Sequence, residues 1–319
     1  MAHEITIRKD GFAEIAFAGE TPWHGLGQEI DQDSSIETWA INAGMDWTID
    51  STPVRYSASN GNDSIFPNQN VLHRSDNGMP LSVVSDRYHP VQPRQVLEFF
   101  KELVDVAGFK IQVAGTLMGG KRMWAIANTG RFAEVKKDDG VGGFLLLSTS
   151  CDRTLATTAR FTTIRVVCNN TLRMATAGKK ADVSFTHLTR WDHVKMNERL
   201  MSAVGEFGAF MDTAKTLQKQ KLNVKAAETF LANLITPWSQ LKGEVDISEN
   251  RQYKAILQLF DGGGKGSEMV GHTKWGMLNA VTEYYDHHAN SRSDDARLNS
   301  AWFGTGDRIK NQALDLLLA

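Results

Sequence analysis

Apolar residues recur at helical spacing between Gln92 and Ala107. Elsewhere in the N-terminal half, apolar and polar residues alternate over short stretches. The apolar residues of 92–107 fall on one side of such a helix, and polar residues fall on the other. Gly108 follows directly, and a glycine just past the last periodic residue is typical of a helix C-terminus. The pattern therefore predicts a helix over 92–107. The residues before it read as loops and short strands.

The pattern changes after this helix to the period of two that extended chains show. Residues 109–113 alternate between apolar and polar, and two adjacent glycines at 119–120 predict a hairpin turn into a returning strand over 121–128. The run 144–147 is continuously apolar, as in a buried central strand. Residues 154–158 are a further strand candidate. These segments together predict a β-rich middle.

Helical spacing returns at residues 161–175, where we expect a second helix. The β-branched residues within 162–167 favour a strand instead, because branching at Cβ restricts the side chain in a helix. From residue 192 onward, apolar stripes at helical spacing predict a mainly helical half, with plausible N-caps at Asn223, Ser248 and Thr273.

This order of elements predicts an α+β fold. We expect a central antiparallel β-sheet packed by helices, with a helix–strands–helix core and a mainly helical C-terminal half. The predicted domains are an α+β core over 1–190, which includes an acidic N-terminal segment, and a helical region over 191–319. No Pro/Gly linker marks the boundary near residue 190.

Composition excludes several classes of protein. The chain has 319 residues, 41% of them apolar and 23% charged, which is typical of globular proteins and excludes collagen-like and disordered chains. Cys151 and Cys168 are too few for a disulfide framework and suit a reducing compartment. The sequence has no apolar run long enough to span a membrane and no secretion signal at its start. We therefore expect a cytoplasmic protein of a bacterial cell that does not enter the membrane.

Charge is distributed unevenly, although the formal net charge is only -2. Residues 1–50 contain ten acidic residues and two basic ones, whereas residues 153–181 contain six basic residues and no acidic one. A basic segment of this kind attracts phosphates. The alternative is a solvated face whose cations pair with the acidic N-terminal segment in the fold.

Four motifs for catalysis or for nucleotide or metal binding are missing or have the wrong spacing. The glycine-rich segment 260–267 lacks the Gly-x-x-x-x-Gly-Lys-Ser/Thr order of a nucleotide-binding phosphate loop. His287 and His288 are adjacent and His272 is distant, so they lack the four-residue spacing of a helical zinc pair. The two cysteines lack Cys-x-x-Cys spacing, and Gly-x-Ser-x-Gly is absent. We expect no cofactor and no metal, and the roles of the glycine-rich segment and of these histidines stay open.

Four stretches of the chain resemble a family of phage- and plasmid-borne proteins of unknown function. The resemblance covers nearly the whole chain, in the family's order, and it implies residence on bacterial mobile DNA without supplying an activity. The stretches are Pro22–Gly27 (PWHGLG), Val84–Tyr88 (VSDRY), Thr163–Leu172 (TIRVVCNNTL) and Thr273–Tyr284 (TKWGMLNAVTEY).

The predicted order of helix, hairpin, strand and helix also resembles the core of single-strand annealing recombinases. That resemblance is one of topology only, and fold alone does not determine function. It implies a homo-oligomer, typically a ring, that holds DNA in a basic groove around its outside. The acidic N-terminal segment and the long helical half depart from that family and put ring formation in doubt.

The sequence therefore predicts a mobile-element DNA-binding protein, a single-stranded DNA-binding and annealing recombinase that acts without covalent catalysis. Annealing requires cations along a backbone and bases that stay free to pair. Phenylalanines at 132, 144, 161 and 185 are candidate stacking residues, but we expect most of them in the core, because aromatic residues at strand and helix spacing usually lie there. One alternative is a phage accessory module that acts on a host protein in defence or regulation; another is an enzyme built around Trp23, His24 and the glycine-rich segment. The candidate nucleic-acid-binding residues are Lys121, Arg122, Arg153, Arg160, Arg165, Arg173, Lys179 and Lys180.

Overall fold

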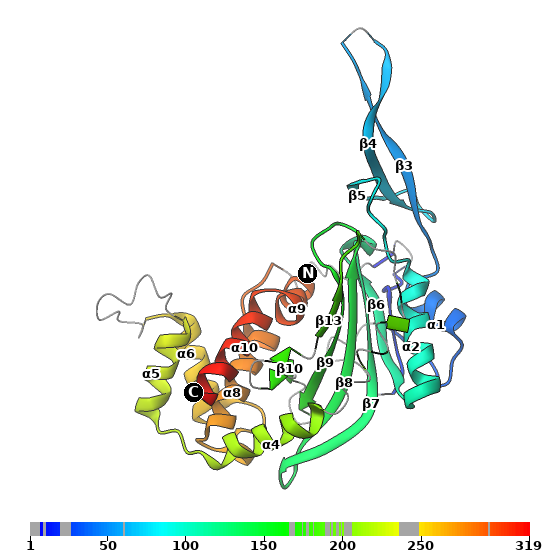
Figure 1. Cartoon of the computed structure of the whole chain (residues 1–319). Coiled ribbons are helices and arrows are strands. Elements are labelled where there is room, and N and C mark those ends of the chain that lie inside the picture. Colours follow the sequence, from blue (N-terminus) through cyan, green and yellow to red (C-terminus); the bar gives the residue numbers. More distant parts are fainter. Residues whose placement is uncertain are drawn as a thin grey trace.

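Figure 1 shows the computed structural model of the chain. It describes residues 7–8, 11–19, 27–59, 61–165, 170–173, 175–176, 179–180, 182–188, 192, 194–195, 198, 200, 206–235, 249–292 and 294–319. Among these residues, no helix is both long enough and apolar enough to cross a membrane.

A curved sheet forms the centre of the molecule (Figure 1). Neighbouring strands in it are antiparallel, except that β1 and β2 run parallel. A further strand, β13 (Asp182–Phe185), also pairs with β9. The order across the sheet is β10 (Asn170–Arg173), β9 (Thr157–Arg165), β8 (Asp139–Ser150), β7 (Arg122–Lys136), β6 (Lys110–Leu117), β1 (Ile15–Phe17) and β2 (Gln28–Glu29).

Both faces of this sheet are buried, because strand alternation gives each face its own hydrophobic cluster. On one face, Met123 and Leu145 join the large cluster that contains Phe100 of α2 (Pro93–Ala107). On the other face, Trp124 packs edge-on against Trp302 of α9 (Asp294–Phe303), at 5.1 Å between ring centroids. The predicted helix over 92–107, the hairpin turn at η1 (Met118–Gly120) and the buried central strand are therefore confirmed.

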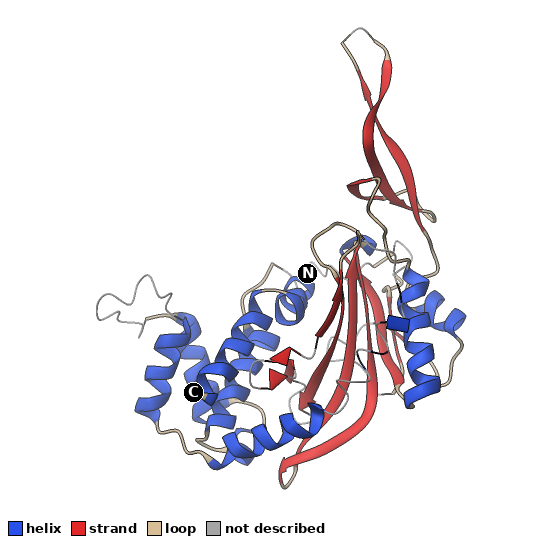
Figure 2. Cartoon of the chain, in the orientation of Figure 1, coloured by secondary structure: helices blue, strands red, loops and turns tan. Residues whose placement is uncertain are grey.

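Helices dominate the chain beyond the last described strand (Figure 2). Inside this half, Lys310 and Asp286 form a buried ion pair at 2.6 Å between Nζ and Oδ1.

The predicted α+β class with a mainly helical C-terminal half is confirmed, and the boundary near residue 190 stays a prediction. The elements are α4 (Glu206–Lys219), α5 (Val224–Ile235), α6 (Arg251–Gln258), η3 (Leu259–Gly263), α7 (Ser267–Val270), α8 (Lys274–Glu283), η4 (Tyr284–His288), α9 and α10 (Thr305–Leu318).

The helix predicted over 161–175 is wrong. Phe161 and Arg165 lie in β9, which is followed by β10 and by a short hairpin of β11 (Ala175–Thr176) and β12 (Lys179–Lys180). The β-branched residues of this segment decided the outcome, because their side chains pack well between neighbouring strands. Phe161 and Phe144 are buried in the two hydrophobic clusters.

A second sheet forms an arm that projects beyond the central sheet (Figure 1). It comprises β3 (Ile49–Ser57), β4 (Asp63–Arg74) and β5 (Pro80–Ser85), and β5 pairs with β4 only between residues 69 and 73 of β4. The outer part of the arm is therefore a two-stranded ribbon. A short helix, α1 (Ile36–Asn42), precedes it and packs against α2.

A buried ionic network fixes the base of the arm. Arg74, at the end of β4, donates to both carboxylate oxygens of Glu14, at 2.9 and 3.1 Å, and to both oxygens of Asp76. Thr116 of β6 donates to Glu14 at 2.6 Å. Burial raises the pKa of Asp76, but the hydrogen bonds and charge of Arg74 outweigh it and leave this pKa lowered. The arm is thus connected to the central sheet through the Arg74–Glu14 pair, which is buried, whereas Asp76 lies at the surface.

Close packing around Arg74 requires a glycine. The guanidinium lies over the Trp47 ring, 4.3 Å from its centroid. A Cβ at Gly120 would approach that ring to 2.6 Å, and the φ of Gly120 is 92°. The second glycine of the predicted hairpin turn therefore serves the arm as well as the turn.

We expect Arg74→Met to lower the free energy of unfolding by about 3–5 kcal/mol, because it leaves a buried carboxylate without its main cation. Urea denaturation followed by circular dichroism measures this loss. Arg94→Met is the matched control, since Arg94 pairs with Glu37 and Glu98 in the open and should change stability little. Equal losses for the two variants would contradict the role of the buried network.

Candidate nucleic-acid interface

Two of the predicted binding residues, Arg160 and Arg165, lie on β9. Five positions separate them, so strand alternation turns their side chains to opposite faces of the sheet. Both side chains are buried. They therefore do not share a groove, and each must be considered against the helices that cover its own face.

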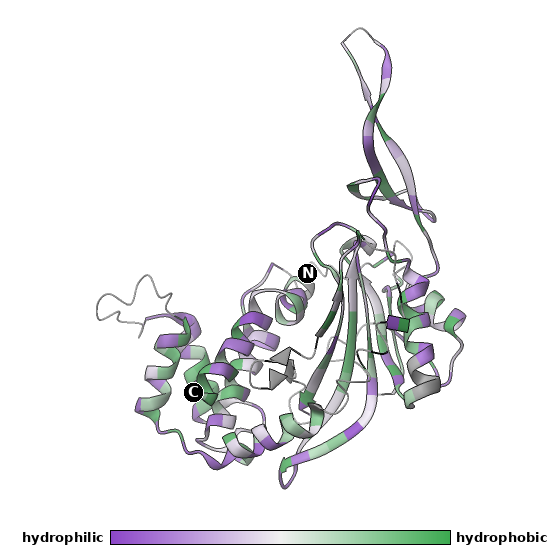
Figure 3. Ribbon diagram, in the orientation of Figure 1, coloured by the Kyte–Doolittle hydropathy of each residue, from purple (hydrophilic) through white to green (hydrophobic). Residues whose placement is uncertain are grey.

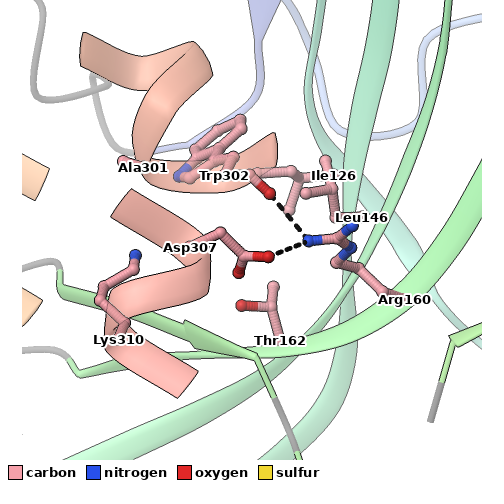
Figure 4. A pocket seen from close by; sticks show the side chains of 8 residues that line it. All are labelled: Ile126, Leu146, Arg160, Thr162, Ala301, Trp302, Asp307 and Lys310. Carbon is pink, nitrogen blue, oxygen red and sulfur yellow. Dashed lines mark hydrogen bonds and ion pairs between the residues drawn. The ribbon is translucent and has the colours of Figure 1, made fainter. Parts of the chain in front are cut away.

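Arg160 faces the helices α9 and α10 (Figure 4). Its Nη1 donates to the carbonyl oxygen of Trp302 at 2.8 Å and to Asp307 Oδ2 at 3.1 Å. The cavity beside it measures about 10 Å³, which is room for about one water molecule. This guanidinium connects the sheet to the helical half and does not line an open track.

Arg165 lies at the far end of β9 and holds the glycine-rich segment. Its Nε donates to Asp139, and its two terminal nitrogens donate to the carbonyl oxygens of Lys265 and Gly266, both at 3.1 Å. The second oxygen of Asp139 accepts from Trp275 Nε1 at 2.9 Å. The segment that resembles a phosphate loop in composition thus binds a protein guanidinium through its backbone.

The other side of the glycine-rich segment is held by α8. The Lys265 N–H donates to both carboxylate oxygens of Glu283, at 3.0 and 3.1 Å. His272 stacks on Phe260 and lies 3.1 Å from Asp261 through its Nε2. Among the described residues, no three His, Cys, Asp or Glu side chains are grouped as a metal site would require.

Three more predicted residues lie at the opposite end of the sheet. Arg122 is buried, and its Nη2 donates to Thr154 Oγ1 at 2.8 Å. Lys121 is half-buried at the hairpin turn, and Arg153 is exposed in the loop between β8 and β9. Lys121 and Arg153 are accessible, but a full strand length separates this end from Arg165.

The remaining predicted residues lie partly or wholly outside the described part of the chain. The backbone of Arg173 in β10 pairs with β9, and the backbones of Lys179 and Lys180 in β12 pair with β11. The side chains of these three residues lie outside the described part of the chain. Trp23 and His24, which the enzyme alternative requires, also lie outside the described residues. Arg165 and Arg173 lie on strands, at the ends of β9 and β10, and not on the helix predicted over 161–175.

The alternative considered from sequence was that the acidic N-terminal segment neutralises the basic segment. The described residues pair differently. Three described acids of that segment, Glu14, Glu37 and Asp46, form ion pairs, and their partners are Arg8, Arg74 and Arg94. The carboxylates that pair with Arg160 and Arg165 come from Asp307 and Asp139 instead. Two arginines of the basic segment are therefore paired by carboxylates that lie outside the acidic N-terminal segment.

An exposed lysine group lies elsewhere, where α4 ends and α5 begins (Figure 1). We call it the lysine corner, and its members are Lys215, Lys219, Lys221 and Lys225, all exposed. No described carboxylate forms an ion pair with any of them. Sequence analysis missed this group, although the stretch 213–227 contains these four lysines and no acid.

Helix stability accounts for only part of the lysine corner. Lys219 lies in the last turn of α4, where the helix macrodipole favours a cation. Lys225 lies in the first turn of α5, where the macrodipole disfavours one, and that turn has no acid. Asn223 already caps this end by accepting from the Ala226 N–H at 2.9 Å. The position of Lys225 therefore requires another explanation.

Comparison with protein families bears on the chain as a whole. A model of a domain of unknown function, DUF932, matches residues 80–302. The chain belongs to the DUF932 family. The eight predicted residues and the lysine corner lie inside the DUF932 match, whereas β3, β4 and the Glu14–Arg74 pair precede it. No curated protein and no solved structure matches the chain.

We expect Arg165→Met to lower the free energy of unfolding by about 3–5 kcal/mol, because Asp139 would stay buried without its cation. Thermal and urea denaturation measure the effect. Arg153→Met is the control, because that side chain is exposed on the same stretch of chain. A stability loss no larger than that of the control would contradict the structural role of Arg165.

The buried Cys151 thiol should resist labelling in the folded protein. Burial raises its pKa to about 12, and the neighbouring Asp152 charge adds to the effect. Because the thiolate is the reactive form, a Cys168→Ala variant should react with a thiol reagent very slowly when folded and rapidly in urea. Equally rapid reaction in both states would contradict this burial.

Proposed function

We propose that this protein binds single-stranded DNA through the lysine corner and promotes annealing of complementary strands, as part of a bacterial mobile element. The observation that carries the proposal is the group of four exposed lysines without a carboxylate partner among the described residues. A phosphate chain is the usual counterion of such a group.

The arrangement of the lysine corner suits a DNA strand that is bound without regard to its base sequence. Lys215 and Lys219 are four residues apart on α4 and therefore lie on one helix face. Lys221 follows in a bridge to Thr273, which fixes the chain between the two helices. Long lysine side chains contact phosphates as point charges and leave the bases free, which annealing requires.

The residues predicted from sequence divide into two groups under this proposal. Arg160 and Arg165 act on the fold, because their guanidinium groups are committed to Asp307 and Asp139. Arg153 and Lys121 remain accessible at the other end of the sheet and are secondary candidates for phosphate contacts. The resemblance to phage- and plasmid-borne proteins supports a substrate from mobile DNA.

We expect glutamine at all four positions of the lysine corner to weaken binding of a labelled single-stranded oligonucleotide. The slope of log affinity against log salt should fall by roughly 0.7 for each lysine that contacts a phosphate. Fluorescence anisotropy across a salt series measures this slope, and the same variant should anneal complementary strands more slowly.

Two matched variants decide whether position or total charge matters. Lys101→Gln with Lys110→Gln removes two exposed lysines far from the corner and should leave the slope unchanged. Lys215→Gln with Lys219→Gln removes two inside it and should lower the slope. Equal effects would reject the lysine corner, and no binding by the wild-type protein at low salt would reject the proposed function itself.

A further inference from the structure

The face of the central sheet under α9 carries polar side chains as well as apolar ones. Trp124 of β7 lies directly opposite Ser148 of β8, and strand alternation puts Arg122 on the same face two positions away. On β9, Arg160 lies diagonally beside Ser148, because Thr158 is the direct partner of Ser148. Figure 3 shows segments of different hydropathy along the strands of this sheet. A row of polar side chains therefore crosses three neighbouring strands on this face.

Buried polar atoms of this row lack a hydrogen-bond partner within the described part of the chain. They include Trp124 Nε1, Ser148 Oγ and Arg160 Nε. The three residues are 2%, 0% and 8% exposed. A buried polar atom without a partner costs free energy, and most such atoms in folded proteins bond to the protein or to a bound group. Two of the three atoms are N–H donors and the third belongs to a hydroxyl, so the group that satisfies them must be an acceptor.

Two carboxylates lie near the row, and both are engaged at other atoms. Asp307 accepts from Nη1 of Arg160, and Figure 4 shows the other nitrogens of this guanidinium on the side away from Asp307. Asp152, whose carboxyl is close enough to feel the charge of Arg122, accepts from the backbone N–H and the hydroxyl of Thr154. An incoming acceptor would thus not have to displace either carboxylate.

The ring of Phe303 separates the row from solvent. The guanidinium carbons of Arg122 and Arg160 lie over this ring, 5.6 and 5.9 Å from its centroid. Phe303 is half-buried, is the last residue of α9 and is followed by the exposed Gly304. The preceding residue, Trp302, holds the backbone in place by accepting from Arg160 Nη1 at 2.8 Å. The Phe303 side chain can therefore turn outward into another rotamer while the helix stays on the sheet.

Two guanidinium groups beside unpartnered donors favour an oxyanion over an aromatic ring. A charge-assisted hydrogen bond to phosphate is stronger than a cation–π contact, so a phosphate group can take the place of the Phe303 ring. Its several acceptor oxygens can bond to more than one donor at once. The sheet closes the bottom of the recess, and α9 closes one side, where Trp302 packs on Trp124. A phosphate group that enters must therefore be at the end of its molecule.

We propose that the recess between the sheet and the end of α9 binds a terminal phosphate group, and that Phe303 is its gate. In the bound state the phosphate oxygens accept from Trp124 Nε1, Arg160 Nε and Ser148 Oγ. Inorganic phosphate, a small phosphomonoester and the phosphorylated 5′ end of a DNA strand share this chemistry. The inference goes beyond the proposed function, because the lysine corner contributes no residue to the recess.

The indole N–H of Trp124 reports the proposed bond directly. In a proton–nitrogen correlation spectrum, inorganic phosphate should move this proton downfield, because a hydrogen bond to an anion deshields its donor. A Trp124→Phe variant identifies the signal among those of the eight tryptophans. The experiment uses the protein with glutamine at all four lysine-corner positions, so that phosphate bound there does not contribute. Chloride at the same ionic strength should leave the signal in place, and an unchanged signal in phosphate would overturn the inference.

Removing the gate should strengthen binding. Phe303→Ala should raise the phosphate affinity, measured by titrating the Trp124 signal, by roughly tenfold, because the ring no longer competes for the two guanidinium groups. Misfolding cannot produce such a gain. Adding Ser148→Ala to this variant should then weaken binding roughly fivefold by removing one hydrogen bond. Phe132→Ala is the control, since that side chain is 60% exposed on a distant part of β7, and it should leave the affinity unchanged.

The inference is wrong if Phe303→Ala binds phosphate no better than the parent protein, or if Ser148→Ala has no effect in its background. Thermal melting establishes that each variant is folded. Phe303→Leu, which keeps apolar bulk but loses the cation–π contacts, should show a smaller gain than Phe303→Ala, and it takes the place of Phe303→Ala if that variant is unstable.

Two oligonucleotides of one sequence distinguish a DNA end from a small molecule. They carry a 5′-phosphate or a 5′-hydroxyl and are added to the wild-type protein. If the ligand is a strand end, only the phosphorylated strand moves the Trp124 signal; if it is a small molecule, inorganic phosphate moves it and neither strand does. Equal shifts with both strands would overturn the inference. Salt-dependent DNA binding with an unmoved Trp124 signal in every experiment would leave the lysine corner standing alone, so the two proposals fail separately.

Discussion

Three buried arginines, Arg74, Arg160 and Arg165, each form an ion pair with a carboxylate from another part of the chain, and these pairs determine how the main elements are joined. Burying a charge costs several kcal/mol unless its partner is in place, so each pair admits one arrangement of the elements that carry it. The first pair fixes the arm, the second fixes the helical half against the sheet, and the third closes the glycine-rich segment.

Elements with a strong local pattern could be predicted from sequence, and elements that depend on distant partners could not. The helix α2 and the hairpin turn at Gly119 and Gly120 follow from apolar spacing and glycine chemistry. The segment from Phe161 onward satisfied two periods at once, and pairing with β8 settled it as a strand. Nothing in the local sequence indicates that Arg165 meets Asp139 rather than solvent.

The same limit explains why the candidate interface in the structure differs from the one predicted from sequence. A run of cations without acids predicts an exposed basic surface, but exposure depends on where the chain places its carboxylates. The stretch 213–227 also contains several cations and no acid, so the lysine corner could have been predicted from sequence. The apolar spacing of its helices does not indicate it. Lysine, with its flexible stem and strongly hydrated ammonium, stays at the surface where the more weakly hydrated guanidinium is readily buried.

The bonds that complete β9 arrive late during synthesis. Trp275 donates to Asp139 from 136 positions away, and Trp302 accepts from Arg160 across 142 positions. At ribosomal speeds, the chain between Arg165 and Trp275 takes roughly 5 to 20 seconds to emerge. Until Trp302 and Asp307 have also emerged, the sheet face that carries Arg160 stays uncovered and Arg160 lacks its carboxylate partner. The N-terminal part therefore cannot reach its final state alone, and the central sheet is completed only when the last helices have left the ribosome.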